Sequence, residues 1–327
     1  MKKATGVRCA GIVAGVMAAA AIGCASDWTS VAEDVPYAGT DAYGDTGAVA
    51  LLTGIQAPSS LQVDRGTVFW VTQDGLWSMP VAGAQPTRIS ESVNSHTFAV
   101  DQDFVYWEDD TDALLRAPRS GGASVRIVSD IGSLQDLALW ADTVYWSSGP
   151  RVMLVSKFAT DGQPQEVSTD LPDWISEGMV VDEHFVFAGV GGAVYRADRA
   201  GTGDWAVVVP NAGLTSNDLF SDGTDLFLSS GGVGLVRRAS KDGAGLRVFE
   251  DQSYTIDMAF DAGWGYWTGS YPCASRMSLQ TGDTQFLRID NLYCHEVAVD
   301  DAWIYWTAQA QSGDVQGIYR APLTNFK

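Results

Sequence analysis

Residues 297–307 read Val-Ala-Val-Asp-Asp-Ala-Trp-Ile-Tyr-Trp-Thr, and variants of this stretch recur along the chain. Two short runs of β-branched and aromatic residues flank an Asp-rich turn, a pattern that predicts two β-strands joined by a tight connection. With Asp300 as the reference position, the equivalents in the other repeats are Asp64, Asp101, Trp140, Asp182, Asp222 and Asp261, at successive spacings of 37, 39, 42, 40, 39 and 39 residues.

A repeat of about 40 residues is typical of one four-stranded blade of a β-propeller. An aromatic residue stands five positions after every reference position, and Gly-rich turns separate the other strands. In the second repeat we expect strands over His96–Val100, Phe104–Trp107, Leu114–Ala117 and Val125–Ser129. The sequence therefore predicts an all-β fold, a seven-bladed β-propeller.

The two ends of the repeat region predict how the ring closes. The last repeat stops after its third strand, near Ala321-Pro322, while an unused strand-like segment, residues 48–53, precedes the first repeat. Because an open ring would expose strand edges, we expect this N-terminal strand to pair with residues around 317–321 and to complete the last blade. Residues 47–327 would then form one domain.

The N-terminus has the pattern of an export signal. Lys2, Lys3 and Arg8 precede an apolar run of 13 residues, Ala10 to Ile22. A transmembrane helix needs roughly 20 apolar residues, so the run fits the core of a signal peptide instead. No second long apolar segment follows, so we expect no transmembrane helix in the mature chain.

The signal ends in Ala21-Ile22-Gly23-Cys24, which resembles a bacterial lipobox. This resemblance implies cleavage after residue 23, lipidation of Cys24 and, because Ala25 follows, a place in the outer membrane of the cell envelope. An ordinary signal peptide with an incidental cysteine is the alternative. Residues 24–46 are rich in Asp, Glu, Gly, Ser and Thr, which predicts a flexible acidic tether.

Charge narrows the classes of partner. Without residues 1–23 the chain keeps 17 basic against 40 acidic residues, a net charge of −23. Such a charge repels nucleic acid and anionic membrane surfaces. The membrane contact that we expect is therefore the lipid anchor, and the remaining partners are a protein, a carbohydrate or a small molecule.

Two cysteines remain for the mature domain, Cys273 and Cys294. A lone pair in an exported protein predicts a disulfide. We expect Cys273 in the loop after the second strand of blade six and Cys294 in the loop that leaves the fourth strand, on the same face of the ring.

The repeat resembles that of YWTD-type propellers, the class found in low-density-lipoprotein-receptor-like proteins. The resemblance rests on residues 297–300, Ile304-Tyr305-Trp306-Thr307, Tyr319-Arg320-Ala321-Pro322 and the turn Ser240-Lys241-Asp242-Gly243. It implies a propeller fold. The final Asp of the family motif is missing in most repeats, with Glu108-Asp109 the nearest match, and the family usually has six blades. The chain is also similar to bacterial lipoproteins with Val-Tyr-Trp repeats.

Residues that recur in every blade are expected to be structural. The reference aspartates sit at turns, where a carboxylate accepts hydrogen bonds from nearby amides. The tryptophans of the Tyr-Trp pairs are expected to pack between blades, whereas loop aromatics such as Trp174 and Tyr271 suit carbohydrate stacking better. No nucleophile elbow or transition-metal motif occurs. The sequence thus favours a non-enzymatic binding scaffold; a metal-dependent hydrolase or lyase that uses the propeller mouth is the alternative.

The central mouth is the predicted ligand site. Residues four and five positions before the reference begin the innermost strands, which converge on the axis. Their carboxylates, taken from several blades, would suit an oxygen-ligated cation such as calcium. A hydrated acidic rim without metal is the alternative. The candidate mouth residues are His96, Asp136, Glu177, Asp218, Asp257, His295 and Glu296.

Overall fold

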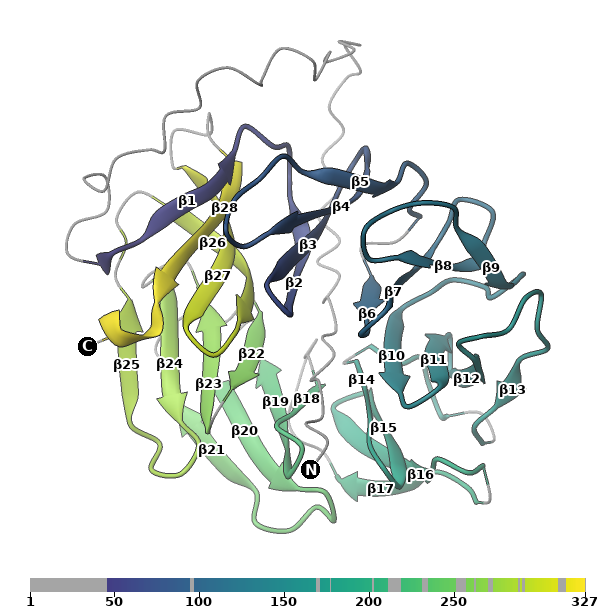
Figure 1. Cartoon of the computed structure of the whole chain (residues 1–327). Helices are drawn as coiled ribbons and strands as arrows, with labels where there is room; N and C mark the ends of the chain where they lie inside the picture. Colours follow the sequence, from purple (N-terminus) through teal and green to yellow (C-terminus); the bar gives the residue numbers. More distant parts are fainter. Residues whose placement is uncertain are drawn as a thin grey trace, which may run out of the picture.

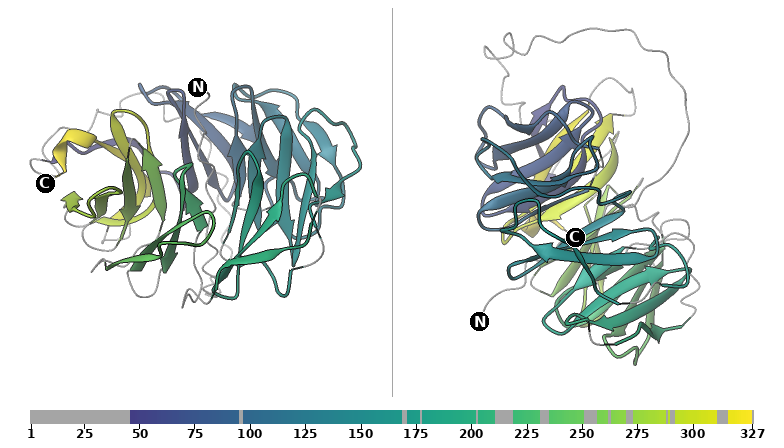
Figure 2. Two further views of the ribbon diagram at one scale, coloured as in Figure 1. Left: turned by 90° about the horizontal axis from the view of Figure 1, so that it is seen from below. Right: turned by 90° about the vertical axis from the view of Figure 1, so that its right-hand side faces the viewer.

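A computed structural model describes residues 46–94, 97–168, 171–176, 178–201, 203–210, 219–230, 235–250, 257–261, 263–269, 273–287, 289, 292–310 and 316–326. They form seven antiparallel four-stranded sheets, the blades, arranged as a ring (Figure 1). In the side views of Figure 2 the inner strands run from one face of the ring toward the other. The predicted all-β, seven-bladed propeller is confirmed. Residues 1–45, with the predicted signal peptide and Cys24, lie outside the described residues.

Six blades are meanders of four consecutive strands whose first strand is innermost, and in the last blade β1 takes the outermost place beside β28 (Figure 1). The first four blades are, in order, β2 (Ser59–Asp64), β3 (Thr67–Thr72), β4 (Gly75–Pro80) and β5 (Thr87–Ser90); β6 (Phe98–Val100), β7 (Phe104–Glu108), β8 (Leu114–Pro118) and β9 (Val125–Val128); β10 (Asp136–Trp140), β11 (Thr143–Ser148), β12 (Arg151–Ser156) and β13 (Gln165–Glu166); and β14 (Met179–Val181), β15 (Phe185–Val190), β16 (Ala193–Asp198) and β17 (Ala206–Val209).

The remaining three blades complete the circle, and a 3-10 helix, η3 (Leu323–Asn325), follows the last strand. They are β18 (Leu219–Ser221), β19 (Asp225–Ser230), β20 (Leu235–Ser240) and β21 (Arg247–Glu250); β22 (Met258–Asp261), β23 (Trp264–Thr268), β24 (Ala274–Ser278) and β25 (Thr284–Leu287); and β26 (Leu292–Val299), β27 (Trp303–Ala310), β28 (Gln316–Pro322) and β1 (Val49–Thr53).

The N-terminal strand closes the ring as predicted. β1 pairs antiparallel with β28, in a register that runs from Val49 opposite Arg320 to Thr53 opposite Gly317. The Asn325 side chain adds a hydrogen bond to the carbonyl of Thr46 at 2.7 Å. Both ends of the described chain are therefore held in one sheet, which leaves no gap between the first and last blades.

The core consists of seven buried apolar clusters, and each combines residues of two neighbouring blades. Successive side chains of a strand point to opposite faces of its sheet. The aromatic residue five positions after the reference therefore packs toward the next blade, and the residue after it packs toward the previous one. The pairs that share a cluster are Phe69 with Trp107, Tyr106 with Trp146, Tyr145 with Ala188, Phe187 with Leu228, Phe227 with Trp267, Tyr266 with Trp306, and Tyr305 with Trp70.

The reference aspartates hold the turns between the first and second strands, as predicted. Asp300 Oδ1 accepts hydrogen bonds from the amides of Ala302 and Trp303 at 2.9 and 2.8 Å, and Oδ2 accepts one from the Tyr305 hydroxyl at 2.7 Å. Asp101 makes the same set of bonds. Burial raises the pKa of Asp101, but these bonds and one from Lys157 together hold that pKa below its ordinary value.

A cation from the next blade pairs with several of these aspartates, an arrangement that sequence reasoning missed. Each cation directly follows the third strand of its blade. Where Trp140 replaces the aspartate, Arg199 of the next blade lies over the indole ring at 6.0 Å from its centroid. The ion pairs are Arg119 with Asp64, Lys157 with Asp101 at 3.0 Å, and Lys241 with Asp182 at 2.7 Å.

Arginines within the third strands form a second set of bonds between blades. Arg320 Nη1 donates to the carbonyl of Val81 at 2.6 Å and so links the last blade to the first. Its guanidinium also stacks on Trp303, 4.5 Å from the ring centroid. Equivalent bonds run from Arg116 to Lys157, from Arg196 to Lys241 and from Arg238 to Leu279.

Candidate functional site: the upper face of the ring

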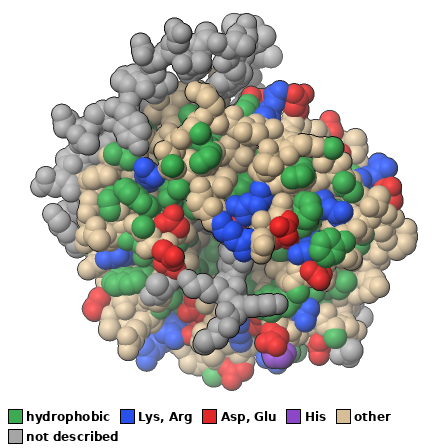
Figure 3. All heavy atoms as spheres, in the orientation of Figure 1, with side chains coloured by type: hydrophobic (Ala, Val, Ile, Leu, Met, Phe, Trp, Pro, Cys, Tyr) green, Lys and Arg blue, Asp and Glu red, His purple; other side chains and the backbone are tan. Residues whose placement is uncertain are grey.

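The ring has two different faces. On the lower face lie the reference aspartates and the turns that join first to second strands. On the upper face the chain enters each innermost strand, and the loops between second and third strands emerge there too. The face turned to the viewer in Figure 3 carries Lys and Arg interspersed with Asp and Glu, several of the basic side chains lying near its centre.

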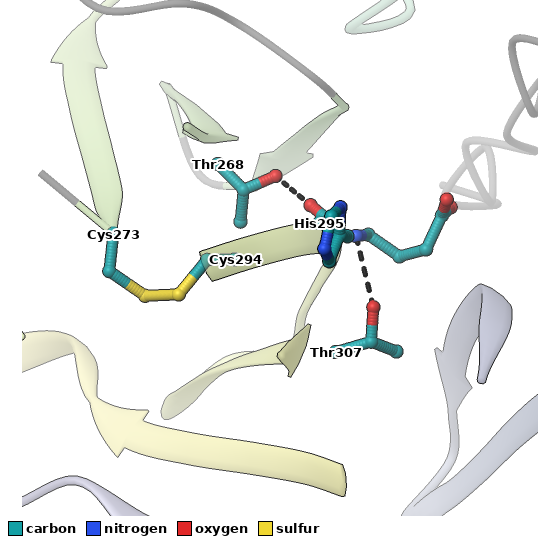
Figure 4. The surroundings of a disulfide bond; sticks show 6 residues. Thr268, Cys273, Cys294, His295 and Thr307 are labelled. Atoms are coloured by element: carbon teal, nitrogen blue, oxygen red, sulfur yellow. Dashed lines mark hydrogen bonds between the residues drawn. A yellow bond between two sulfur atoms is a disulfide. The ribbon is translucent and has the colours of Figure 1, made fainter. Parts of the chain in front are cut away.

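The predicted disulfide is confirmed and lies on the upper face. Cys273 directly precedes β24, and both cysteines are fully buried, with their Cα atoms 5.3 Å apart. The expected place of Cys294 was wrong by a few residues, because β26 starts at Leu292 and so contains Cys294. The bridge therefore joins blade six to the innermost strand of blade seven (Figure 4).

Two of the predicted mouth carboxylates, Asp136 and Asp257, are buried, with 2% and 5% of their surface exposed. Asp257 Oδ1 accepts a hydrogen bond from the amide of Met258, and Oδ2 accepts one from the amide of Val297, both at 2.8 Å. Asp136 bonds to Leu137 and Met179 in the same way, at 2.7 and 2.5 Å. Each carboxylate thus joins the innermost strands of two neighbouring blades.

His295 and Glu296 are positioned through their backbone atoms. The Thr268 hydroxyl of blade six donates to the carbonyl of His295, and the amide of Glu296 donates to Thr307 Oγ1 at 3.2 Å (Figure 4). The His295 side chain is exposed and Glu296 is half-buried. These contacts hold the middle of β26 between two threonines that both follow a Tyr-Trp pair.

The remaining mouth residues, His96, Glu177 and Asp218, lie outside the described residues. Within the described part of the chain, no group of three or more His, Cys, Asp or Glu side chains is arranged to hold a metal ion. The buried aspartates are occupied by amide donors, which makes them structural links between blades. The calcium site for the complete set of seven residues stays a prediction.

Glu108, at the end of β7, is a buried carboxyl that the mouth prediction did not include. Only 1% of its surface is exposed, and this burial raises its pKa to about 7, against hydrogen bonds from Asn94 and Leu134 that lower it. Among the described residues, Glu108 Oε1 has no hydrogen-bond partner. The repeat could have pointed to this residue, because four of the six equivalent positions hold a hydroxyl side chain and none of the six holds a charge. These positions are Val71, Ser147, Gly189, Ser229, Thr268 and Thr307.

Trp174 is held outward on the upper face by a fixed loop between blades three and four. The amide of Leu171 donates to the Pro150 carbonyl at 2.9 Å, and that of Ile175 donates to the Gly149 carbonyl at 3.3 Å. The side chains of Leu171 and Ile175 are buried, whereas Trp174 is 59% exposed. Its amide donates to Asp173 Oδ1 at 2.8 Å. The indole is therefore presented to solvent on an anchored segment; Tyr271, the other loop aromatic of interest, lies outside the described residues.

A shallow pocket lies on the lower face of blade four. Two of its charged side chains bond to backbone groups: Arg199 Nε donates to the carbonyl of Glu183 at 3.1 Å, and Asp198 Oδ1 accepts from the amide of Ala200 at 2.8 Å. His184 and Phe185 form the rest of its lining. The pocket thus brings an exposed histidine near charged groups of the same blade.

No family model matches the chain, and no curated protein matches it. The YWTD-type resemblance therefore stays a prediction. Three solved propellers are similar in structure, all at low sequence identity: virginiamycin B lyase from Staphylococcus aureus (13% identity, TM-score 0.64, covering 84% of this chain and 98% of that one), YCF48 bound to D1 peptide (12%, 0.61, 84% and 95%), and BamB from Moraxella catarrhalis (14%, 0.53, 81% and 83%).

These similarities show a propeller fold and nothing narrower, and the seven sheets of this chain make it a seven-bladed β-propeller. One of the three is an enzyme by its name, and another was solved with a peptide bound. Within the described residues there is no helix long and apolar enough to cross a membrane.

Proposed function

We propose that this protein is a non-enzymatic propeller that binds a protein or peptide on its upper face. The observation that carries the proposal is Trp174, a large aromatic side chain that an anchored loop holds in solvent. Aromatic side chains on a rigid support contribute strongly to protein interfaces, since they bury much area and lose little conformational freedom. YCF48, which was solved with the D1 peptide, has the same overall architecture.

The polar residues of the ring support a scaffold role in a second way. The carboxylates of Asp136, Asp257 and Asp300 accept hydrogen bonds from backbone amides, and the cations of the third strands bond to neighbouring blades. A catalytic carboxylate needs a free oxygen in reach of substrate. Here the repeated charged groups stabilise the ring, which leaves the variable upper loops to bind.

Photo-crosslinking tests which face binds. A photoreactive residue at the exposed Ser176, beside Trp174, should give a specific protein adduct in intact cells. The same residue at Thr160, exposed on the lower face of blade three, is the matched control. Equal adducts at both positions, or none at Ser176, would contradict the proposal.

We further propose that the propeller is tethered to the bacterial envelope through a lipid on Cys24, with residues 24–46 as spacer. The support is the lipobox-like sequence at Ala21–Cys24. Cys24→Ser should move the protein from the membrane fraction to the soluble fraction. Ala25→Asp should keep the lipid but shift the protein from the outer to the inner membrane, and retention of Cys24→Ser in the outer membrane would refute the anchor.

A further inference from the structure

Four loops form a continuous arc on the upper face of blades two to four: residues 109–113, 129–135, 148–150 and 171–176. The first contacts the second through a hydrogen bond from the amide of Ile131 to the carbonyl of Asp112 at 3.0 Å. Gly132 lies so close to the third that a Cβ there would sit 2.5 Å from Ser148 Oγ. The bond from Ile175 to Gly149 joins the third to the fourth.

This arc carries negative charge without compensation from its own residues. The four loops contain five aspartates and neither Lys nor Arg. Two cations lie beside the arc and have partners outside it: Arg126 pairs with Asp161 and Arg151 with Glu166, both at 2.6 Å. Arg126 is also attracted by Asp109 and Asp130. The aspartates, which we call the acidic arc, are Asp109, Asp110, Asp112, Asp130 and Asp173, and all but the first are exposed.

Trp174 forms one end of the arc, directly after Asp173. Its ring lies over the turn at Gly149, where an added Cβ would be 4.0 Å from Trp174 Cε2. An exposed indole next to a carboxylate attracts a guanidinium or ammonium group, because the cation gains contact with the ring face and with the negative charge together. A row of aspartates beside the indole adds a charge–charge attraction that a cationic ligand gains and a neutral sugar does not.

Buried polar groups beneath the arc are incompletely satisfied. Glu108, on the strand that leads into loop 109–113, is 1% exposed, and Ser147, on the strand that leads into the turn at 148–150, is fully buried. Neither Glu108 Oε1 nor Ser147 Oγ has a hydrogen-bond partner among the described residues. Ten buried side-chain atoms of the described residues share this property, and Gln135 Oε1, in the second loop of the arc, is another of them.

We infer that the acidic arc and Trp174 together bind a cationic segment of polypeptide, with an Arg or Lys stacked on the indole and further basic residues along the aspartates. The inference rests on the proposed function and adds the class of partner. Charge complementarity speeds encounter and selects the partner, while the indole supplies the buried contact.

The test uses the full chain in detergent and fluorescence anisotropy. The probe is a labelled synthetic peptide of Arg, Pro and Gly, and the comparison peptide has Glu in place of Arg. We expect binding of the Arg peptide only, and a loss of about tenfold or more in affinity between about 50 and about 300 mM NaCl, since salt screens exposed charges.

Matched variants assign the site. Trp174→Ala should lower the affinity for the Arg peptide at least about fivefold. Phe158→Ala, which removes an exposed aromatic side chain from the lower face, should leave that affinity unchanged. The double variant Asp112→Asn/Asp130→Asn should lower the affinity for the Arg peptide about threefold to tenfold at low salt. The lower-face double variant Asp103→Asn/Asp142→Asn should have little effect on this affinity. Both pairs remove the same charge.

Two outcomes overturn the inference in distinguishable ways. Equal binding of the Arg and Glu peptides, together with a specific adduct at Ser176 in cells, would keep the proposed function and reject a cationic partner. Salt-independent binding of a neutral oligosaccharide that Trp174→Ala abolishes, with no adduct at Ser176, would reject both.

Discussion

The carboxylate of Asp257 accepts a hydrogen bond from the amide of Val297 at 2.8 Å and so ties the innermost strand of blade six to that of blade seven. Its other oxygen accepts a hydrogen bond from the amide of Met258 in its own blade. Asp136 repeats the arrangement toward Met179. A side chain that stands at the mouth of the ring therefore acts as a link between blades, and this explains why it is buried although it is charged.

Replacing Asp257 by Ala should destabilise the fold. Two buried amides would lose their acceptor, and each unsatisfied group costs about 1–3 kcal/mol, so we expect a loss of about 2–6 kcal/mol in the free energy of unfolding. Asp257→Asn keeps one acceptor and should lose less. Chemical denaturation measures both variants, with Asp103→Asn at an exposed position as control. If Asp257→Ala left the free energy of unfolding unchanged, the link between the blades would be dispensable.

Glu108 should make stability depend on pH near neutrality. Its pKa is raised from 4.5 to about 7 in the folded protein. The folded state therefore binds more protons than the unfolded state between these values, so its stability falls as pH rises from about 4.5 to about 7 and then levels off. At about 1.4 kcal/mol per pKa unit, the full effect is at most about 3 kcal/mol.

The variant Glu108→Gln removes the titrating group. Its free energy of unfolding should exceed that of the parent by about 1–3 kcal/mol at pH 8, and the difference should shrink toward pH 4.5. Urea titrations at both pH values measure it. A parent-like pH slope in Glu108→Gln would mean that another group causes the dependence.

The disulfide should stabilise the join between blades six and seven. It closes a loop with a sequence separation of 21 residues, for which chain entropy predicts about 3 kcal/mol. The double variant Cys273→Ser/Cys294→Ser should unfold at a lower denaturant concentration, and its free energy of unfolding should be lower by about 3 kcal/mol. Reductant should shift the parent protein to the same midpoint and leave the double variant unaffected; a parent insensitive to complete reduction would contradict the prediction.

Deleting residues 47–54 should open the ring. The deletion removes β1 and leaves the outer edge of β28 unpaired, so we expect a loss of several kcal/mol and concentration-dependent association through the exposed edge. Calorimetry and light scattering measure the two effects. Deleting the equally long segment 29–36 is the control, and equal behaviour of both deletions would refute a closing role for β1.

Much of the architecture followed from the sequence, because the determinants of a propeller are local and repeated. The spacing of Asp64 to Asp300 predicted the blades, the unused segment at residues 48–53 predicted the closure, and the lone pair Cys273 and Cys294 predicted the bridge. Each rests on period, strand propensity or count, properties that a sequence carries without knowledge of which residues meet in space.

The roles of individual charged residues depended on contacts between blades. Asp136 and Asp257 had the right register for a ligand-binding mouth, yet their oxygens bond to amides about 40 residues further along the chain. Lys157 and Lys241 likewise pair with aspartates of the preceding blade. Such partners come together only when the ring forms, so the sequence could place these residues on a strand but not assign their bonds.

Burial separated the candidate site from the scaffold. The sequence by itself determined a closed seven-bladed ring with a cysteine bridge, because periodic strands and a missing last strand have one compact solution. Only the tertiary structure decided that Glu108 is enclosed while Trp174 stands in solvent at one end of the acidic arc. The physical reason is that exposure depends on how loops of neighbouring blades cover one another. Leu171 and Ile175 turn inward, and the three residues between them, which include Trp174, are left in solvent.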